Sequence, residues 1–277
     1  MIYRYSGWDS YTQDAIKNRY FWFSKPTNFN DPLDPNMDCF KAFKLNENSD
    51  IKGFVKYIKE KTDNFGVLCF TEKTNSGEIG DKGFNNSHFW SHYADFHKGI
   101  ALGFDSSTIE TYYSDKLSCQ ADLAKVKYRT EPLNLDKDNI VLEEGNNYTK
   151  TKKASGILSN GGTDKERDTL FTSLLFSKDS RIWGIENESR IVLGGFALAH
   201  LKSNNPFTCQ PFHIINAEGY KIPYPEGDIL KEITFGVKFP QIKRDNTIKM
   251  ILKNHNNVKF YQGALDFSNG DILRTTI

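Results

Sequence analysis

Two glutamates at the head of a hydrophobic strand are the residues of this chain best placed for chemistry. They are Glu186 and Glu188, in the segment WGIENESRIVL at 183–193. Because alternate side chains of a strand share a face, Glu186, Glu188 and Arg190 are expected to project together. The opposite face is expected to carry Ile185, Ile191 and Leu193. Buried carboxylates need cations, so the group is either a salt-bridge ladder closed by Arg190 or a pair that stabilises a cationic transition state.

A second charged side chain, Arg4, lies in the middle of the first expected strand, between Tyr3 and Tyr5. An arginine on a central strand needs an anion, and its planar guanidinium suits a carboxylate or a phosphate. Glu186 would satisfy it within the fold, and the phosphate or ribose of a ligand would satisfy it in a binding site. The residues alone leave both alternatives open.

Two histidines four residues apart, His88 and His92, share a face of an expected helix and could bind a metal ion. The segment lacks the glutamate of the HExxH motif, and the spacing fixes no third ligand. The same helix has a packing face of Phe89, Trp90, Tyr93 and Ala94. Structural histidines are therefore favoured over a metal site.

The segment FNDPLD at 29–34 places Asn30 and Asp31 directly before a proline. Asparagine and aspartate ahead of proline are common turn formers, which favours a structural turn. Because the segment follows a strand, it would also suit a loop that lines a ligand site.

Charge and cysteine content indicate which kinds of ligand and which cellular compartment suit the protein. The 277 residues include 36 basic and 35 acidic side chains, for a formal net charge of +1. This balance argues against broad coating of nucleic acid but not against a nucleic-acid substrate in a small pocket. Four scattered cysteines without a CxxC pair indicate free thiols in a reducing compartment. Since no signal peptide or long apolar segment is present, a cytoplasmic protein without membrane contact is expected.

Hydrophobic alternation predicts the sheet, and helical spacing predicts the helices around it. The expected core strands cover 2–5, 20–24, 65–70, 99–104 and 187–193, followed by strands at 212–216, 230–236 and 257–261. The expected helices cover 10–18, 50–63, 88–97, 163–175 and 242–254. Residues 129–162, poor in large apolar groups, are expected to form a surface excursion. The pattern predicts one α+β domain over 1–277, with a mixed or mostly antiparallel sheet and flanking helices.

The ordered motifs resemble a bacterial family of unknown function over essentially the whole chain. They are YRYS, FNDPLD, FWSHYADFHKG and WGIENESRI. Its members share a Y-[KRH]-Y strand, an FNDPxD or FNDPxE loop, a WxHYAxxHxG segment and a WxxExExR strand.

A more distant resemblance is to ADP-ribosyltransferases, above all the toxin branch that modifies nucleic acids. YRYS, a helix and a strand ending at Ser24 are similar to the opening of that fold, and ESRIVL is similar to its late strand. The resemblance implies an ADP-ribosyltransferase-like fold with NAD as cofactor. It places Arg4 in the basic first-motif position and Glu188 as the catalytic glutamate, while Ser24 and Tyr93 compete for the second motif. Arg4 and Glu188 are then expected to line one cleft.

These residues suit the implied reaction. Breaking the bond between nicotinamide and ribose creates an oxocarbenium-like centre that Glu188 would stabilise. Glu186 would orient or deprotonate the acceptor, and Arg4 would hold ribose or pyrophosphate. The expected NAD-binding residues are Arg4, Tyr5, Ser24, Asn30, Asp31, Trp90 and Tyr93. Of these, the aromatic ones would stack on nicotinamide.

The leading hypothesis is therefore an NAD-dependent ADP-ribosyltransferase that acts as an intracellular toxin or phage-defence effector. Its acceptor would be RNA or DNA in preference to protein, and an antitoxin or chaperone would fit as a partner. One alternative is a non-enzymatic sensor or interaction module in which the glutamates form a structural ladder. The other is a metal-dependent hydrolase or nuclease that uses His88, His92 and carboxylates.

Overall fold

The structure is a computed structural model that describes most of the chain. It covers residues 1–29, 65–72, 83–116, 123–130, 139–144, 148–153, 156–157, 162–193, 219–268 and 270–277. Several predicted features lie outside these residues, namely the helix over 50–63, the strand over 212–216, Asn30 and Asp31.

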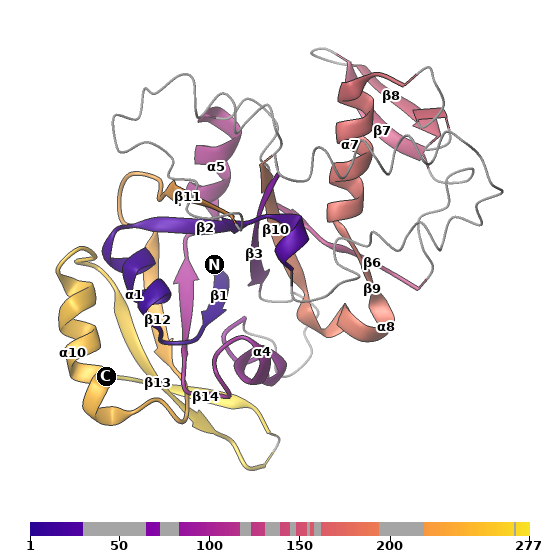
Figure 1. Cartoon of the computed structure of the whole chain (residues 1–277). Coiled ribbons are helices and arrows are strands. Elements are labelled where there is room, and N and C mark those ends of the chain that lie inside the picture. The colour runs from indigo at the N-terminus through magenta and orange to yellow at the C-terminus, as the bar shows by residue number, and fades with distance from the viewer. Residues whose placement is uncertain are drawn as a thin grey trace.

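A ten-stranded, mostly antiparallel sheet forms the centre of the described structure (Figure 1). Its order is β11-β2-β3-β1-β4-β12-β13-β14, and β10 and β5 join it through β3. The strands are β1 (Ile2–Ser6), β2 (Tyr20–Ser24), β3 (Gly66–Glu72), β4 (Ile100–Phe104), β5 (Leu123–Lys125), β10 (Glu188–Leu193), β11 (Gly219–Pro223), β12 (Leu230–Phe235), β13 (Lys259–Leu265) and β14 (Ile272–Thr276). The pair β12–β13 is parallel. Every strand predicted for the core belongs to this sheet, and the predicted α+β class is confirmed.

Helices, some of them with side-chain caps, accompany the sheet. They are α1 (Ser10–Lys17), α4 (Ser87–His92), α5 (Ser106–Lys116), α7 (Asp164–Leu175), α8 (Ser180–Trp183) and α10 (Gln241–Leu252), with short 3-10 turns η1 (Pro26–Asn28) and η3 (Gly184–Glu186). Asp9 caps α1 by accepting a hydrogen bond from the Thr12 amide at 2.8 Å. Thr163 and Glu166 form the predicted capping box of α7. Among the described helices, none has both the length and the apolar character needed to span a bilayer.

Apolar clusters cover both faces of the sheet, and the alternation along β1 shows how they divide. Ile2 faces the larger cluster, which includes Phe21 and Phe70. Tyr3 and Tyr5 face the smaller cluster, which includes Phe84, Phe89 and Trp90. A side chain of β1 therefore reaches one face or the other according to its place in the alternation.

The helix predicted over 88–97 is wrong in its second half. It ends at His92, and Asp95, Phe96 and His97 have left-handed φ values of 45°, 51° and 69°. The reversed chain is held by hydrogen bonds from the His97 amide to the Trp90 carbonyl and from the Gly99 amide to the Ala94 carbonyl. Aromatic side chains at helical spacing concealed a tight turn that delivers the chain into β4.

The predicted excursion over 129–162 contains regular structure. An antiparallel hairpin of β7 (Asn139–Glu144) and β8 (Tyr148–Lys153) lies beside α7, away from the main sheet (Figure 1). A second small element pairs β6 (Lys127–Arg129) in parallel with β9 (Ser177–Asp179). The latter pair leads directly into the segment that carries Glu186 and Glu188.

We predict that Gly99→Ala destabilises the protein by about 2 kcal/mol, because a Cβ there would lie 2.1 Å from the Ser6 carbonyl oxygen. Urea unfolding measures the loss. Gly7→Ala is the control, since its nearest contact would be an ordinary 3.7 Å to Asp95 Cβ. Equal unfolding midpoints for the two variants would show that this close approach does not constrain the fold.

Candidate functional site

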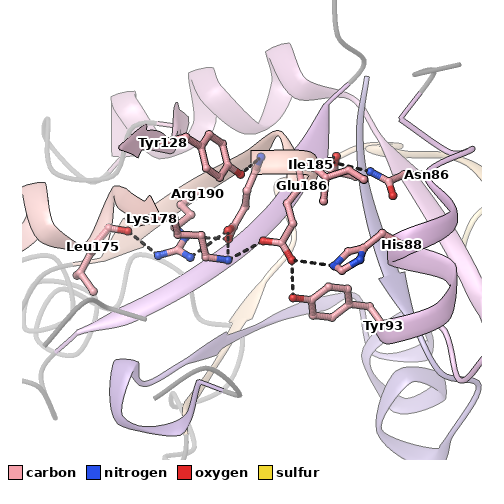
Figure 2. A network of polar contacts seen from close by, with 11 residues as sticks. Asn86, His88, Tyr93, Tyr128, Leu175, Lys178, Ile185, Glu186 and Arg190 are labelled. Carbon is pink, nitrogen blue, oxygen red and sulfur yellow. Dashed lines mark hydrogen bonds and ion pairs between the residues drawn. The ribbon is translucent and has the colours of Figure 1, made fainter. Parts of the chain in front are cut away.

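Glu186 and Glu188 converge on a third charged side chain, Lys178 of β9, which the sequence motifs do not include. Lys178 Nζ lies 2.7 Å from Glu186 Oε2 and 2.8 Å from Glu188 Oε2. Figure 2 shows Lys178 between Arg190 and Glu186. All four side chains are more than nine-tenths buried. The prediction that Glu186, Glu188 and Arg190 lie together is confirmed, with Lys178 as the link.

The backbone brings the glutamates together by a turn rather than by regular strand alternation. Glu186 ends η3, and Asn187 follows in the left-handed conformation with φ 44° before β10 begins at Glu188. Asn187 Nδ2 donates to the Glu72 carbonyl at 3.0 Å, and Thr71 Oγ1 donates to the Glu186 carbonyl at 2.9 Å. These contacts fasten the turn to the end of β3.

The apolar face expected opposite the glutamates is correct in part. Ile191 and Leu193 are fully buried in the larger core cluster, as the alternation of β10 requires. Ile185 is 61% exposed, so its predicted place on that face is wrong. The reason is that Ile185 belongs to η3, where the period of two does not hold.

Arg190 and Glu188 form the salt bridge that the sequence suggested. Arg190 Nε and Nη2 donate to the two carboxylate oxygens at 2.7 and 3.0 Å, and Nη1 donates to the Leu175 carbonyl at 2.6 Å. Burial raises the pKa of Glu188, but the positive charges of Arg190 and then Lys178 outweigh it and lower that pKa to about 2. Glu188 is therefore ionised at neutral pH.

Glu186 has different neighbours on the side of α4. Tyr93 Oη donates to Glu186 Oε1 at 2.7 Å, and His88 Nε2 lies 3.8 Å from the same oxygen (Figure 2). Burial, then the charge of Glu186, raises the pKa of the Tyr93 phenol, so its hydroxyl stays protonated and donates. Burial, then His92, lowers the pKa of His88, whose side chain is 23% exposed. Glu186 is itself only 1% exposed, so it differs from Glu188 in its neighbours, which are a phenol and a partly exposed imidazole in place of Arg190.

The metal-site alternative gains no support. Across the described ranges, no three histidine, cysteine, aspartate or glutamate side chains form a group that could hold a metal ion. The rings of His88 and His92 are neighbours, with centroids 4.3 Å apart, but the adjacent Glu186 carboxylate is already bound by Lys178 and Tyr93.

Arg4 does not join this cluster, so the expectation that Arg4 and Glu188 line one cleft is wrong in that form. Thr71 of β3 is paired with Glu188 of β10 on one side and with Tyr3 of β1 on the other. Paired residues of neighbouring strands share a face, so Glu188 lies on the same face of the sheet as Tyr3. Arg4 alternates with Tyr3 and lies on the other face, level with Leu102. This removes the direct Arg4–Glu188 pair on which the resemblance to ADP-ribosyltransferases drew, and Glu186 is not the partner of Arg4 either.

Arg4 lies instead at a break in the backbone ladder. On the edge of β3 away from β10, β2 pairs at Val67 and β1 pairs at Thr71 and Glu72, so the described ladder is interrupted over 68–70. Arg4 Nη1 donates across this interval to the Trp22 carbonyl at 3.3 Å. Burial lowers the pKa of Arg4, while Cys69 and Tyr224 act in the opposite direction. Arg4 therefore joins β1 to β2 beside β3.

The other predicted NAD-binding residues are dispersed. Trp90 is fully buried and donates through Nε1 to the Phe84 carbonyl, and Tyr5 packs edge-on against it with ring centroids 5.1 Å apart. Neither ring offers a face for nicotinamide, so stacking by these two residues is not supported. Ser24 ends β2 opposite Val67. Among the expected stacking residues, Tyr93 is the one that reaches the glutamates.

The comparisons with known proteins give a partial match to one family and no activity. Residues 89–191 match the family model described as Protein of unknown function (DUF2971). This range begins within α4, includes Tyr93, Lys178 and the segment from Trp183 to Arg190, and covers a little over a third of the chain. No curated protein and no solved structure matches the chain significantly.

Sequence reasoning missed two members of the site, Lys178 and Tyr128. Tyr128 of β6 accepts a hydrogen bond from the Glu188 amide at 2.8 Å, which fixes the start of β10. Neither residue has a spacing to the glutamates that a strand or helix period would reveal. The available signal was the unbalanced charge of two buried glutamates against one arginine, which called for a second cation.

We predict that Glu188→Gln is less stable than the wild type by about 3 kcal/mol near pH 7, because Arg190 and Lys178 lose a buried anion. The pKa of Glu188 is depressed, so its contribution is present above the unfolded value of 4.5 and is lost as pH falls towards about 2. The difference between the two proteins should therefore shrink with acidity in urea unfolding. Glu110→Gln on the exposed face of α5 is the control, and a difference independent of pH would contradict the assignment.

Proposed function

We propose that the protein is an NAD-dependent ADP-ribosyltransferase whose NAD site lies at the break in the ladder along β3. The observation that carries the proposal is the position of Cys69, in the middle of the break. Cys69 is level with Arg190, the partner of Glu188, and it lies in the interval that Arg4 crosses from the other face. A ligand at the break, rather than in a cleft on one face, would have Arg4 on one side and Glu188 on the other.

Arg4 has the properties of an anion-binding group. Its guanidinium carries five donors, and among the described residues it makes one hydrogen bond, to the neutral carbonyl of Trp22. Partial burial strips water from the charge without supplying a carboxylate. A pyrophosphate would provide the missing anion, and two of its oxygens could accept side by side from the fork of the guanidinium.

The glutamates suit the two halves of the transfer. Glu188 is held ionised, so it would stabilise the positive charge that develops on ribose as the bond to nicotinamide breaks. Glu186 neighbours Tyr93 and His88, and the partly exposed His88 marks the side from which an acceptor would approach and give up its proton. Roles as a toxin or phage-defence effector, and RNA or DNA as acceptor, belong to the same proposal and rest on the resemblance in sequence.

A second candidate is a non-enzymatic sensor or interaction module. The observation in its favour is that Lys178 and Arg190 balance both glutamates, and that each Glu188 oxygen already has a donor. In this interpretation the cluster is an internal salt-bridge network that fixes the fold. The two candidates differ in whether the protein consumes NAD.

The test incubates the purified protein with labelled NAD and with separate pools of DNA, RNA and protein. We predict release of nicotinamide and transfer of label to one pool. Glu188→Gln should lower NAD turnover per folded molecule at least about 100-fold, because it deletes the charge facing the ribose.

A companion prediction concerns Arg4→Gln, which should raise the KM for NAD about tenfold or more by removing a charged contact to pyrophosphate. Arg167→Gln and Glu110→Gln are the matched controls and should leave turnover and KM unchanged. If the wild type consumes no NAD with any pool, the interaction module becomes the better assignment. If Glu188→Gln keeps full turnover, Glu188 is not the catalytic glutamate and the proposed site is wrong.

A further inference from the structure

One ammonium group joins the two glutamates, and it comes from outside the motif that contains them. We infer that Lys178 is a positioning residue of the proposed transferase site, which holds Glu186 and Glu188 side by side by binding one oxygen of each. The inference rests on the proposed function for its catalytic meaning, but its structural basis can be tested without NAD.

The contact geometry shows why Lys178 can do this. The two N–O distances, 2.7 and 2.8 Å, are those of charge-assisted hydrogen bonds, and both go to Oε2 atoms. The remaining oxygen of Glu186 is bound by Tyr93, and that of Glu188 by Arg190. Each carboxylate is thus fixed at both ends, with Lys178 as the shared contact.

The backbone around Lys178 is itself fixed to the site. Lys178 is level with Tyr128 in the parallel β6–β9 pair, and Tyr128 Oη holds the Glu188 amide. The ring of Trp183, five residues further along the chain, lies over the ammonium at 5.1 Å from Nζ to the ring centroid. This explains a tryptophan at the head of the glutamate motif, since it covers the cation that the glutamates share.

Electrostatics predicts what the loss of Lys178 would do. Two buried carboxylates without a shared cation repel each other, and one of them takes up a proton at a higher pH. The charged and titratable groups that face this pair come from every adjacent element, namely Arg190, Cys69, Tyr128, Tyr93 and His88. Arg190 stays bound to Glu188 in a Lys178 variant, so the change should fall on the pair rather than on the whole fold.

The experiment compares Lys178→Met, Lys178→Arg and the control Lys127→Met, which removes an exposed lysine from the neighbouring strand. Infrared spectra recorded during acid titration report the protonated carboxyl group directly. We expect Lys178→Met to gain a carboxylic-acid band at least about one pH unit above the wild type. Lys178→Arg, which keeps the charge, should restore the wild-type titration, and Lys127→Met should match it.

The activity arm uses the pH profile of nicotinamide release. In Lys178→Met, the pH at which kcat/KM falls on the acid side should rise by the same number of pH units as the infrared band. The loss of a merely structural lysine would not cause this matched shift. An unchanged infrared titration overturns the inference even if the enzyme is active.

A shifted infrared band in a protein whose wild type consumes no NAD supports the shared-cation geometry and overturns the proposed function instead. If Lys178→Met does not fold, Lys178→Met with Glu186→Gln removes the repulsion and should refold with the titration of Glu188 close to that of the wild type.

Discussion

The ammonium of Lys178, shared by two buried carboxylates, is the interaction on which the rest of this site depends. Two carboxylates and two cations lie together out of water. Removing one of them leaves an uncompensated buried charge, which costs about 3–5 kcal/mol of folding stability. The elements that carry these charges, β9, η3 and β10, therefore cannot move independently. Tyr93 and Tyr128 extend the same network to α4 and β6. The cluster fixes the fold locally, whatever chemistry it performs.

The neighbours of β3 determine how this cluster relates to the rest of the sheet. β10 pairs with β3 along its length, whereas the opposite edge is divided between β2 and β1. Arg4 spans the interval between those two strands, and Cys69 lies in it. A continuous sheet would separate Arg4 from Glu188 by its full thickness. The break would allow one ligand to contact both, which is why the proposed site is placed there rather than on a face.

Both the stability of the fold and the proposed reaction require Glu188 to be ionised. A carboxylate that faces a developing cation must be charged and must already be oriented, so that little reorganisation occurs during reaction. Arg190 and Lys178 supply both conditions, but they also occupy its oxygens. Glu186 is equally buried, but it has Tyr93 and a partly exposed His88 in place of the second cation. This asymmetry is the physical basis for assigning the two glutamates to different steps.

The sequence by itself determined the core strands, because hydrophobic alternation depends on local burial and needs no tertiary partner. It did not predict β5, β11 or β14. The core strands, the caps of α1 and α7 and the pairing of Glu188 with Arg190 followed from local patterns, whereas Glu186 reaches them through a left-handed turn at Asn187. The turn at 95–97 was misread because left-handed backbone leaves no mark in the spacing of Phe89, Trp90 and Tyr93. The face of Arg4 relative to Glu188 depends on the register of β1 and β10 with β3, and register is set by contacts between segments far apart in the chain. Lys178 and Tyr128 reach the glutamates for the same reason, since only the pairing of β6 with β9 brings them there. Local sequence thus specified which residues are charged and buried, and tertiary structure alone decided which of those charges meet.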